Sequence, residues 1–203
     1  MANNGLMHLD KRAFQRDTCK IRTIDLSDNL LTFPNTIVDD NLSNSPVSSC
    51  RELTDIDLSN NSISTIFFDW KFTFTSLKTL NLRKNRITVL DLADNGFGSG
   101  AEIDVQNNNI SEVVLRGLDD FLNVDGLSPP VKIKVLLDGN PISCDCHNYH
   151  LLRYFERKLD PKVSELHTSA VIRVHSKATR TFMPCIRTLN FVSHLRRCTT
   201  GSI

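Results

Sequence analysis

Residues 53–63 read Leu53-Thr54-Asp55-Ile56-Asp57-Leu58-Ser59-Asn60-Asn61-Ser62-Ile63. Apolar and polar residues alternate around Ile56, an asparagine follows Leu58 three residues later, and Ile63 closes the unit. Alternation with a period of two predicts a short strand with one buried face. We expect the chain to turn inward at Asn61. Its amide side chain can donate and accept hydrogen bonds, so it can satisfy backbone groups that the turn leaves unpaired.

The same frame recurs along the chain. It fits residues 21–31 and 77–87, and weaker copies occupy 100–110 and 132–142, where Lys132 takes the first apolar position. The recurring asparagines are Asn29, Asn61, Asn85, Asn108 and Asn140. A repeat of about 20–29 residues with this pattern is the leucine-rich repeat. The two longest separations between these asparagines predict insertions at 35–49 and 119–130, which are rich in turn-forming residues.

These repeats predict a solenoid whose short strands stack in parallel on a concave side. One repeat cannot bury its own apolar edge, so neighbours must stack and the ends must be capped. Asn4 and the residues after it match the second half of a repeat, 25 residues before Asn29. The sequence therefore predicts a partial repeat over 1–18, as in a truncated chain, and repeats over 19–143.

A cysteine-rich segment follows the last repeat and reads Pro141-Ile142-Ser143-Cys144-Asp145-Cys146-His147-Asn148-Tyr149-His150-Leu151-Leu152-Arg153-Tyr154-Phe155. It resembles the C-terminal cysteine cap of extracellular leucine-rich-repeat proteins, and insect-type Toll receptors in particular. The resemblance implies an α/β solenoid, a leucine-rich-repeat arc closed by a disulfide-bonded cap over 144–203. It further implies that Cys144 pairs with Cys185 and Cys146 with Cys198, although the spacing of these cysteines differs from the usual one.

Two other features of the cap segment come from its residues. Leu151, Leu152, Phe155 and Leu159 recur at helical spacing and predict a helix near 148–159 that covers the end of the core. Zinc is an alternative for Cys144, Cys146, His147 and His150, since it accepts both residue types. Because Cys-x-Cys-His is not a standard zinc spacing, we predict no metal and no cofactor.

The remaining cysteines, Cys19 and Cys50, precede consecutive strands by similar offsets. Equivalent positions on adjacent strands lie about 5 Å apart, which is compatible with a disulfide. Two buried thiols that fill core positions are the alternative. The even total of six cysteines suits an oxidising compartment.

The outward residues of the strands predict two columns on the concave face. One column is Asp25, Asp57, Asn81, Asp104 and Leu136, and the other is Thr23, Asp55, Thr79, Glu102 and Lys134. The acidic members form a stripe that is interrupted by Arg83, Lys84 and Arg86. We predict a docking face for a protein with basic residues, made of Asp25, Asp55, Asp57, Glu102, Asp104 and Arg83. A solvated polar face without a partner is the alternative.

Further surface features bear on location. Glycosylation sequons occur at Asn41, Asn60 and Asn109. We expect Asn41 to lie in an insertion loop and the other two to be partly shielded beside the ladder asparagines. An aromatic cluster surrounds Trp70, which belongs either to the core or to an exposed partner contact.

Composition and charge exclude several function classes. The net charge is +1, with a net −5 over 1–143 and +6 over 144–203, unlike the continuous basic face that nucleic acid needs. No apolar run of about 18 residues is present, so the sequence predicts no membrane span. We find no nucleophile–base pair, phosphate loop or paired-carboxylate motif, and therefore predict no enzymatic activity and no catalytic residues.

The resemblance implies a ligand-recognition ectodomain of a Toll-like cell-surface receptor in innate immune or developmental signalling. The implied ligand is a cytokine-like protein or a microbial pattern, and a receptor dimer is implied as well. The chain would then lie on the extracellular face of the plasma membrane, attached through a segment beyond Ile203, with secretion as the alternative. Two other hypotheses stay open: an extracellular-matrix or neuronal adhesion and guidance protein, and an intracellular repeat scaffold with free thiols or a metal.

Overall fold

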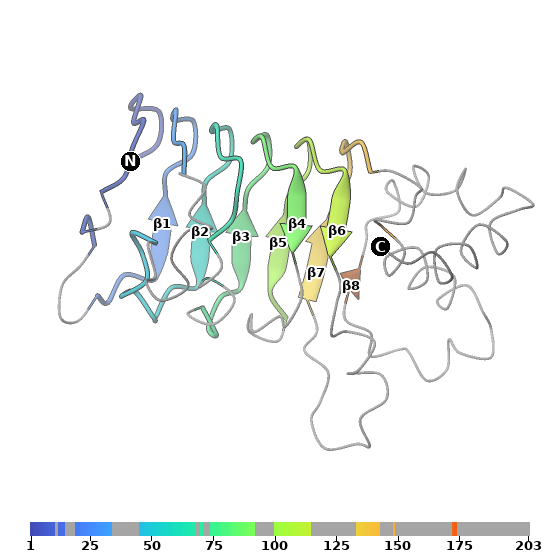
Figure 1. Cartoon of the computed structure of the whole chain (residues 1–203). Helices are drawn as coiled ribbons and strands as arrows, with labels where there is room; N and C mark the ends of the chain where they lie inside the picture. Colours follow the sequence, from blue (N-terminus) through green and yellow to red (C-terminus); the bar gives the residue numbers. More distant parts are fainter. Residues whose placement is uncertain are drawn as a thin grey trace, which may run out of the picture.

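The computed structural model describes residues 1–10, 12–14, 19–33, 45–67, 70, 74–91, 100–114, 133–142, 148 and 172–173. The elements with bounds in these residues are strands: β1 (Thr23–Asp25), β2 (Asp55–Asp57), β3 (Thr79–Asn81), β4 (Val89–Asp91), β5 (Glu102–Asp104), β6 (Glu112–Val114), β7 (Ile133–Leu136) and β8 (Ile172–Arg173). Strands β1, β2, β3, β5 and β7 stand in one row, and the turns that follow them line up along the top of the view (Figure 1).

The main sheet is parallel, with the strand order β1-β2-β3-β5-β7-β8. Asp25 pairs with Asp57, Asp57 with Asn81, Asn81 with Asp104, and Asp104 with Leu136. This register confirms the predicted central column, and the adjoining column is confirmed in the same way. The predicted repeat frames were each in the correct register because a shift by one residue would turn the buried middle residue outward.

The apolar positions of the frame form one continuous core. In the second repeat Leu53, Ile56, Leu58 and Ile63 are all buried, and the same positions of the other repeats join them. This confirms the leucine-rich-repeat solenoid that the frame predicts. Each repeat closes its core only against its neighbours, so the array gains stability through the contacts between repeats.

The recurring asparagines form a hydrogen-bonded ladder along the turns. Asn85 shows the pattern: its Nδ2 donates to the carbonyl oxygens of Leu58 and Leu82, and its Oδ1 accepts from the backbone N–H of Ile63. Each amide thus joins its own repeat to the preceding one. Equivalent bonds and burial recur at Asn29, Asn61, Asn108 and Asn140.

The front end of the chain joins this ladder. The Nδ2 of Asn29 donates to the carbonyl of Met1, and its Oδ1 accepts from the backbone N–H groups of Asn4 and Leu6. The carbonyl of Met1 therefore accepts from Asn29 in the same way as the carbonyl of Leu26 accepts from Asn61. This contact fits the second half of a repeat at the front of the chain.

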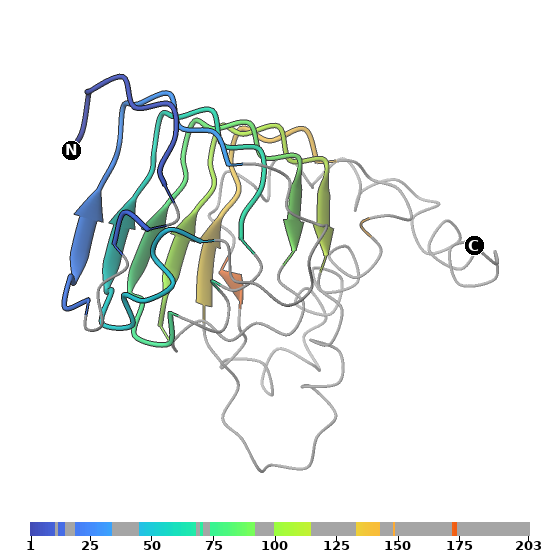
Figure 2. The same ribbon diagram turned by 60° about the vertical axis from the view of Figure 1, so that its left-hand side comes forward.

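A second parallel sheet, which the sequence analysis missed, pairs β4 with β6. It lies apart from the row of concave strands, on the other side of the repeats (Figure 2). Leu90 and Val113 point into the core from these strands. Only three residues alternate in each strand, too few to separate a strand from a turn by pattern alone.

A column of left-handed backbone conformations precedes the ladder asparagines. Positive φ angles occur at Asp28 (53°), Asn60 (54°), Lys84 (55°), Asn107 (55°) and Gly139 (76°). Asparagine, aspartate and glycine tolerate this conformation better than other residues do. Lys84 departs from that rule, and the repeat frame alone does not predict this column of positive φ angles.

The aromatic cluster is part of the core. Trp70 is 1% exposed, and its Nε1 donates to the Ser45 hydroxyl at 2.6 Å. Its ring lies against Phe33, Phe67 and Phe74. The alternative of an exposed partner contact at Trp70 is therefore wrong, because the indole is buried among these rings and bonds Ser45 of the predicted insertion.

Cys19 and Cys50 form a disulfide, with their Cα atoms 4.7 Å apart. Of the two possibilities that the sequence left open, the structure has the bond rather than two separate thiols. Cys50 is fully buried and Cys19 packs against the core. The bridge therefore ties together the segments that lead into β1 and β2, in the first two complete repeats.

We expect the double substitution Cys19→Ala/Cys50→Ala to destabilise the chain by about 3 kcal/mol, because it removes a constraint on the unfolded chain. The bridged residues are 31 positions apart, so the closed loop is long enough for this effect. Urea unfolding with and without reductant measures it. Reduction should cost the unmodified chain more stability than it costs the variant, since any cap disulfide is reduced in both; reactive thiols at Cys19 and Cys50 in the folded, unreduced chain would contradict the bridge.

Most of the predicted cap falls outside the described residues, including Cys144, Cys146, Cys185, Cys198 and the helix near 148–159. Asn148 is described and fully buried. Its Oδ1 accepts from the backbone N–H of Val113, and its Nδ2 donates to the carbonyl of Ser111. An amide side chain therefore pairs with the backbone of β6, a role that the sequence analysis did not assign.

Candidate protein-binding face

The concave sheet carries a shallow groove of about 450 Å³. Both predicted columns line it from β1 to β5, with Asp25, Asp55, Asp57, Glu102 and Asp104 among the lining residues. The register therefore brings together all five predicted acidic residues. Arg83 lies two residues beyond β3 and is exposed, and it is not among the residues that line the groove.

Each central acidic residue also closes a turn after its strand. The Oδ1 of Asp25 accepts from the backbone N–H of Ser27, and the equivalent oxygens of Asp57 and Asp104 accept from Ser59 and Gln106. Asn81 makes the same bond to Arg83. A short carboxylate or amide that bonds the backbone two residues later is a local turn device. This turn could have been predicted from the sequence, because an Asp or Asn recurs in each repeat two residues before the backbone N–H that it bonds.

Side-chain bonds between strands neutralise part of the stripe. Glu102 forms a salt bridge with Lys134 at 2.8 Å. Asp55 accepts from the Thr79 hydroxyl, and Asp57 accepts from the Asn81 amide at 3.0 Å. A surface ion pair such as Glu102–Lys134 contributes little stability. It does, however, leave the aspartates as the main acidic groups of the groove.

The aspartates differ in their protonation equilibria. Hydrogen bonds from the Ser27 side chain and backbone lower the pKa of Asp25, and the Thr79 and Thr54 hydroxyls lower the pKa of Asp55. Burial raises the pKa of Asp104, against the opposing effects of the Gln106 backbone and of Arg83. A lowered pKa stabilises the fold above the unfolded-state pKa and loses this effect as the pH falls through the folded value. A raised pKa instead destabilises the fold above the folded-state value, and this penalty is lost as the pH falls to the unfolded-state value.

We therefore expect Asp104→Asn to stabilise the chain at pH 7. The amide keeps the acceptor for Gln106 but removes a charge that is penalised by burial and by Glu102 and Asp138. The gain should shrink as the pH falls through the raised pKa and vanish below the usual aspartate pKa of about 3.9. Thermal unfolding of both proteins between pH 3 and pH 7 tests this. A gain that is constant across that range would contradict a raised pKa at Asp104.

Two predicted glycosylation sites are more accessible than expected. Asn60 and Asn109 are both exposed, so the prediction of partial shielding is wrong for them. The reason is that each adjoins a ladder asparagine in sequence but points out of the turn. Asn41 lies outside the described residues.

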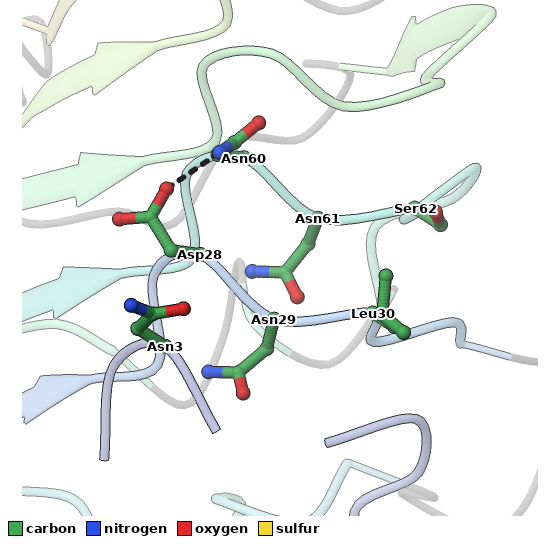
Figure 3. Close-up of a pocket in the computed structure, with 7 residues that line it drawn as sticks. All are labelled: Asn3, Asp28, Asn29, Leu30, Asn60, Asn61 and Ser62. Atoms are coloured by element: carbon green, nitrogen blue, oxygen red, sulfur yellow. Dashed lines mark hydrogen bonds between the residues drawn. The ribbon is translucent and has the colours of Figure 1, made fainter. Parts of the chain in front are cut away.

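A polar hollow of about 630 Å³ lies along the turn edge, away from the concave groove. It is lined by Asn3, Asp28, Asn29, Leu30, Asn60, Asn61 and Ser62 (Figure 3). Asn60 donates from its amide to Asp28 across the two turns. The lining is mostly occupied by bonds between repeats, so we assign this hollow to the ladder.

The described residues contain no helix long and apolar enough to cross a membrane. They also contain no group of three or more His, Cys, Asp or Glu side chains arranged to hold a metal ion.

Comparison with known proteins agrees with this geometry. The Leucine Rich Repeat family matches residues 52–71, the second repeat. The chain therefore has the fold of a leucine-rich-repeat solenoid. It is also 33% identical over 105 residues to Protein toll of Drosophila melanogaster, covering 51% of this chain and 9% of that protein.

Two solved structures share this leucine-rich-repeat fold. Both are Toll–Spatzle complexes from Drosophila. The glycosylated form has a TM-score of 0.63 at 24% identity, covering 86% of this chain and 22% of that chain. The other has a TM-score of 0.56 at 19% identity, covering 84% and 24%. The chain thus spans less than a quarter of each relative.

Proposed function

We propose that this chain is the ligand-recognition part of a Toll-like receptor ectodomain and that its concave face docks a protein with basic residues. The acidic groove carries the proposal. It is lined by four aspartates on paired strands, Asp25, Asp55, Asp57 and Asp104. Of the five acidic residues in the stripe, only Glu102 forms a salt bridge. Charge of one sign along a concave wall steers a partner of the opposite sign. The similarity to Toll, solved in complex with Spatzle, supports a cytokine-like protein as the ligand.

We also propose an extracellular location. The Cys19–Cys50 disulfide is typical of oxidising compartments, and the exposed Asn60 and Asn109 could accept glycans there. The predicted pairing of two receptor chains, the cap disulfides and a microbial ligand stay predictions. A binding role without catalysis is what the leucine-rich-repeat family favours.

The groove itself offers a sharp test. Asp57→Asn creates a glycosylation sequon in the middle of the concave face, because Leu58 and Ser59 already supply its second and third residues. In a glycosylating host, this variant should carry a glycan on the proposed docking surface and lose binding to Spatzle, used here as the probe. The double variant Asp57→Asn/Ser59→Ala has the same amide without the sequon and is the matched control.

The expected result is binding by the unmodified chain, a partial loss in the control and a complete loss in the glycan-bearing variant, with the glycan verified by mass. Equal binding by the glycan-bearing variant would overturn the concave docking site. Absence of binding by the unmodified chain would overturn a Spatzle-like ligand.

A further inference from the structure

A basic turn lies on the edge of the solenoid, outside the acidic groove. It consists of Arg83, Lys84 and Arg86, which surround the ladder residue Asn85. All three cationic side chains are exposed. The ion pairs among the described residues are Arg22–Glu52 and Glu102–Lys134, so none of the three takes part in one.

The backbone of this turn is held from both sides. Lys84 donates its backbone N–H to Gln106 of the next repeat at 2.9 Å, and Arg86 donates to Ile63 of the preceding one at 2.8 Å. Asn60 donates to the carbonyl of Arg83 at 2.8 Å. The turn is therefore fixed before any ligand arrives, and binding does not have to order a loop.

Lys84 occupies a position that is unfavourable for lysine. Its φ is 55°, and the equivalent positions of the other repeats are Asp28, Asn60, Asn107 and Gly139. Those residue types tolerate the left-handed conformation, whereas lysine does so at a cost. A residue that breaks the local rule without a packing reason points to a function for its side chain.

The surroundings select the class of ligand. Exposed amides flank the basic turn on both sides, at Asn60, Asn107 and Asn109. They can bond hydroxyl groups. The exposed large apolar side chains of the described residues are Met1, Met7, Ile21, Leu30 and Val89, and none lies in this turn. Single-stranded nucleic acid binds through stacking rings, which this turn lacks, so the fixed cations and the neighbouring amides favour a sulfated sugar.

We propose that the basic turn binds a sulfated polysaccharide, with Lys84 and Arg86 as its principal contacts. Sulfate groups on an extended chain match cations presented on an open edge, and sugar hydroxyls match the neighbouring amides. This site is independent of the concave docking face. Arg83 borders both surfaces, since its charge opposes the rise that burial causes in the pKa of Asp104, so the test leaves Arg83 unchanged.

Heparin is the probe, and Lys84→Gln/Arg86→Gln is the test variant. The matched control is Arg51→Gln/Lys78→Gln, which removes two exposed cations elsewhere on the same chain. Enzymatic glycan removal beforehand clears any glycan at Asn60 or Asn109. We expect the test variant to bind heparin about tenfold or more weakly at 0.1 M salt, with a salt dependence shallower by about two contacts. The control should stay within about twofold, since its charges lie off the site.

Lys84→Asn gives a second, independent readout. Because asparagine suits the positive φ, this variant should unfold at a higher temperature than the unmodified chain while binding heparin more weakly. Weaker heparin binding by a more stable variant would show that a ligand contact is lost while the fold is kept.

Several outcomes would overturn the proposal. Equal weakening of the test and control variants would mean nonspecific charge attraction, and full binding by the test variant would exclude the turn. Retention of desulfated heparin as strong as that of heparin would exclude sulfate recognition. If the unmodified chain binds vesicles of anionic lipid more strongly than the test variant does, and neither binds heparin, the turn would be assigned to a membrane surface instead.

Discussion

Asn85→Ala is expected to destabilise the chain by about 3 kcal/mol, because the buried N–H of Ile63 loses its partner and the carbonyls of Leu58 and Leu82 each lose one of two amide donors. Its amide donates to the carbonyls of Leu58 and Leu82 and accepts from the N–H of Ile63. The side chain is 8% exposed, so water does not readily replace these bonds. Urea unfolding measures the loss.

The matched control for this substitution is Asn109→Ala, in protein made without glycans. Asn109 is exposed, and its change should cost less than about 0.5 kcal/mol. Hydrogen exchange adds a local readout, since the amide of Ile63 should lose protection in Asn85→Ala and keep it in the control. A small effect of Asn85→Ala, with Ile63 still protected, would show that the ladder amides do not hold the repeats together.

The ladder and the concave columns were predictable from sequence, and the physical reason is the same for both. A repeated frame places equivalent residues in register, and burial of its apolar face allows no slip by one position. Asp57 and Asp104 could therefore be assigned to one column, and Asn85 to one ladder, from the repeat frame alone. The hydrogen bonds that these aspartates accept from the turn backbone were not predictable, because they depend on the backbone geometry after the strand.

Other features depend on details that a frame does not carry. The bond between Cys19 and Cys50 could not be separated from two core thiols, since both need the same spacing. The second sheet escaped because β4 and β6 are only three residues long. The cost at Lys84 is visible only once φ is known. These misses all lie in turns and short strands, where local geometry rather than periodicity decides the structure.

Trp70→Ala is expected to have an effect of about 4–5 kcal/mol, since it removes a large buried ring and leaves a cavity. The ring centroids of Phe67 and Phe74 lie 5.6 and 5.7 Å from that of Trp70. It is the single tryptophan of the chain, so its fluorescence reports directly on this site. A blue-shifted emission in the folded chain is expected, and a maximum typical of exposed tryptophan would contradict the buried position.

A milder pair of substitutions separates packing from hydrogen bonding at Trp70. Trp70→Phe keeps an aromatic ring but leaves the buried Ser45 hydroxyl without the indole donor, and Ser45→Ala leaves the Nε1–H of Trp70 without its acceptor. Each should cost about 1–3 kcal/mol, because an unsatisfied buried group costs more than a missing bond. The double variant should cost less than the sum of the two, since neither polar group then remains. Strict additivity would mean that the indole and the hydroxyl stabilise the core independently. It would therefore exclude the hydrogen bond between them as a determinant of how the turn at 45–49 is held against the core.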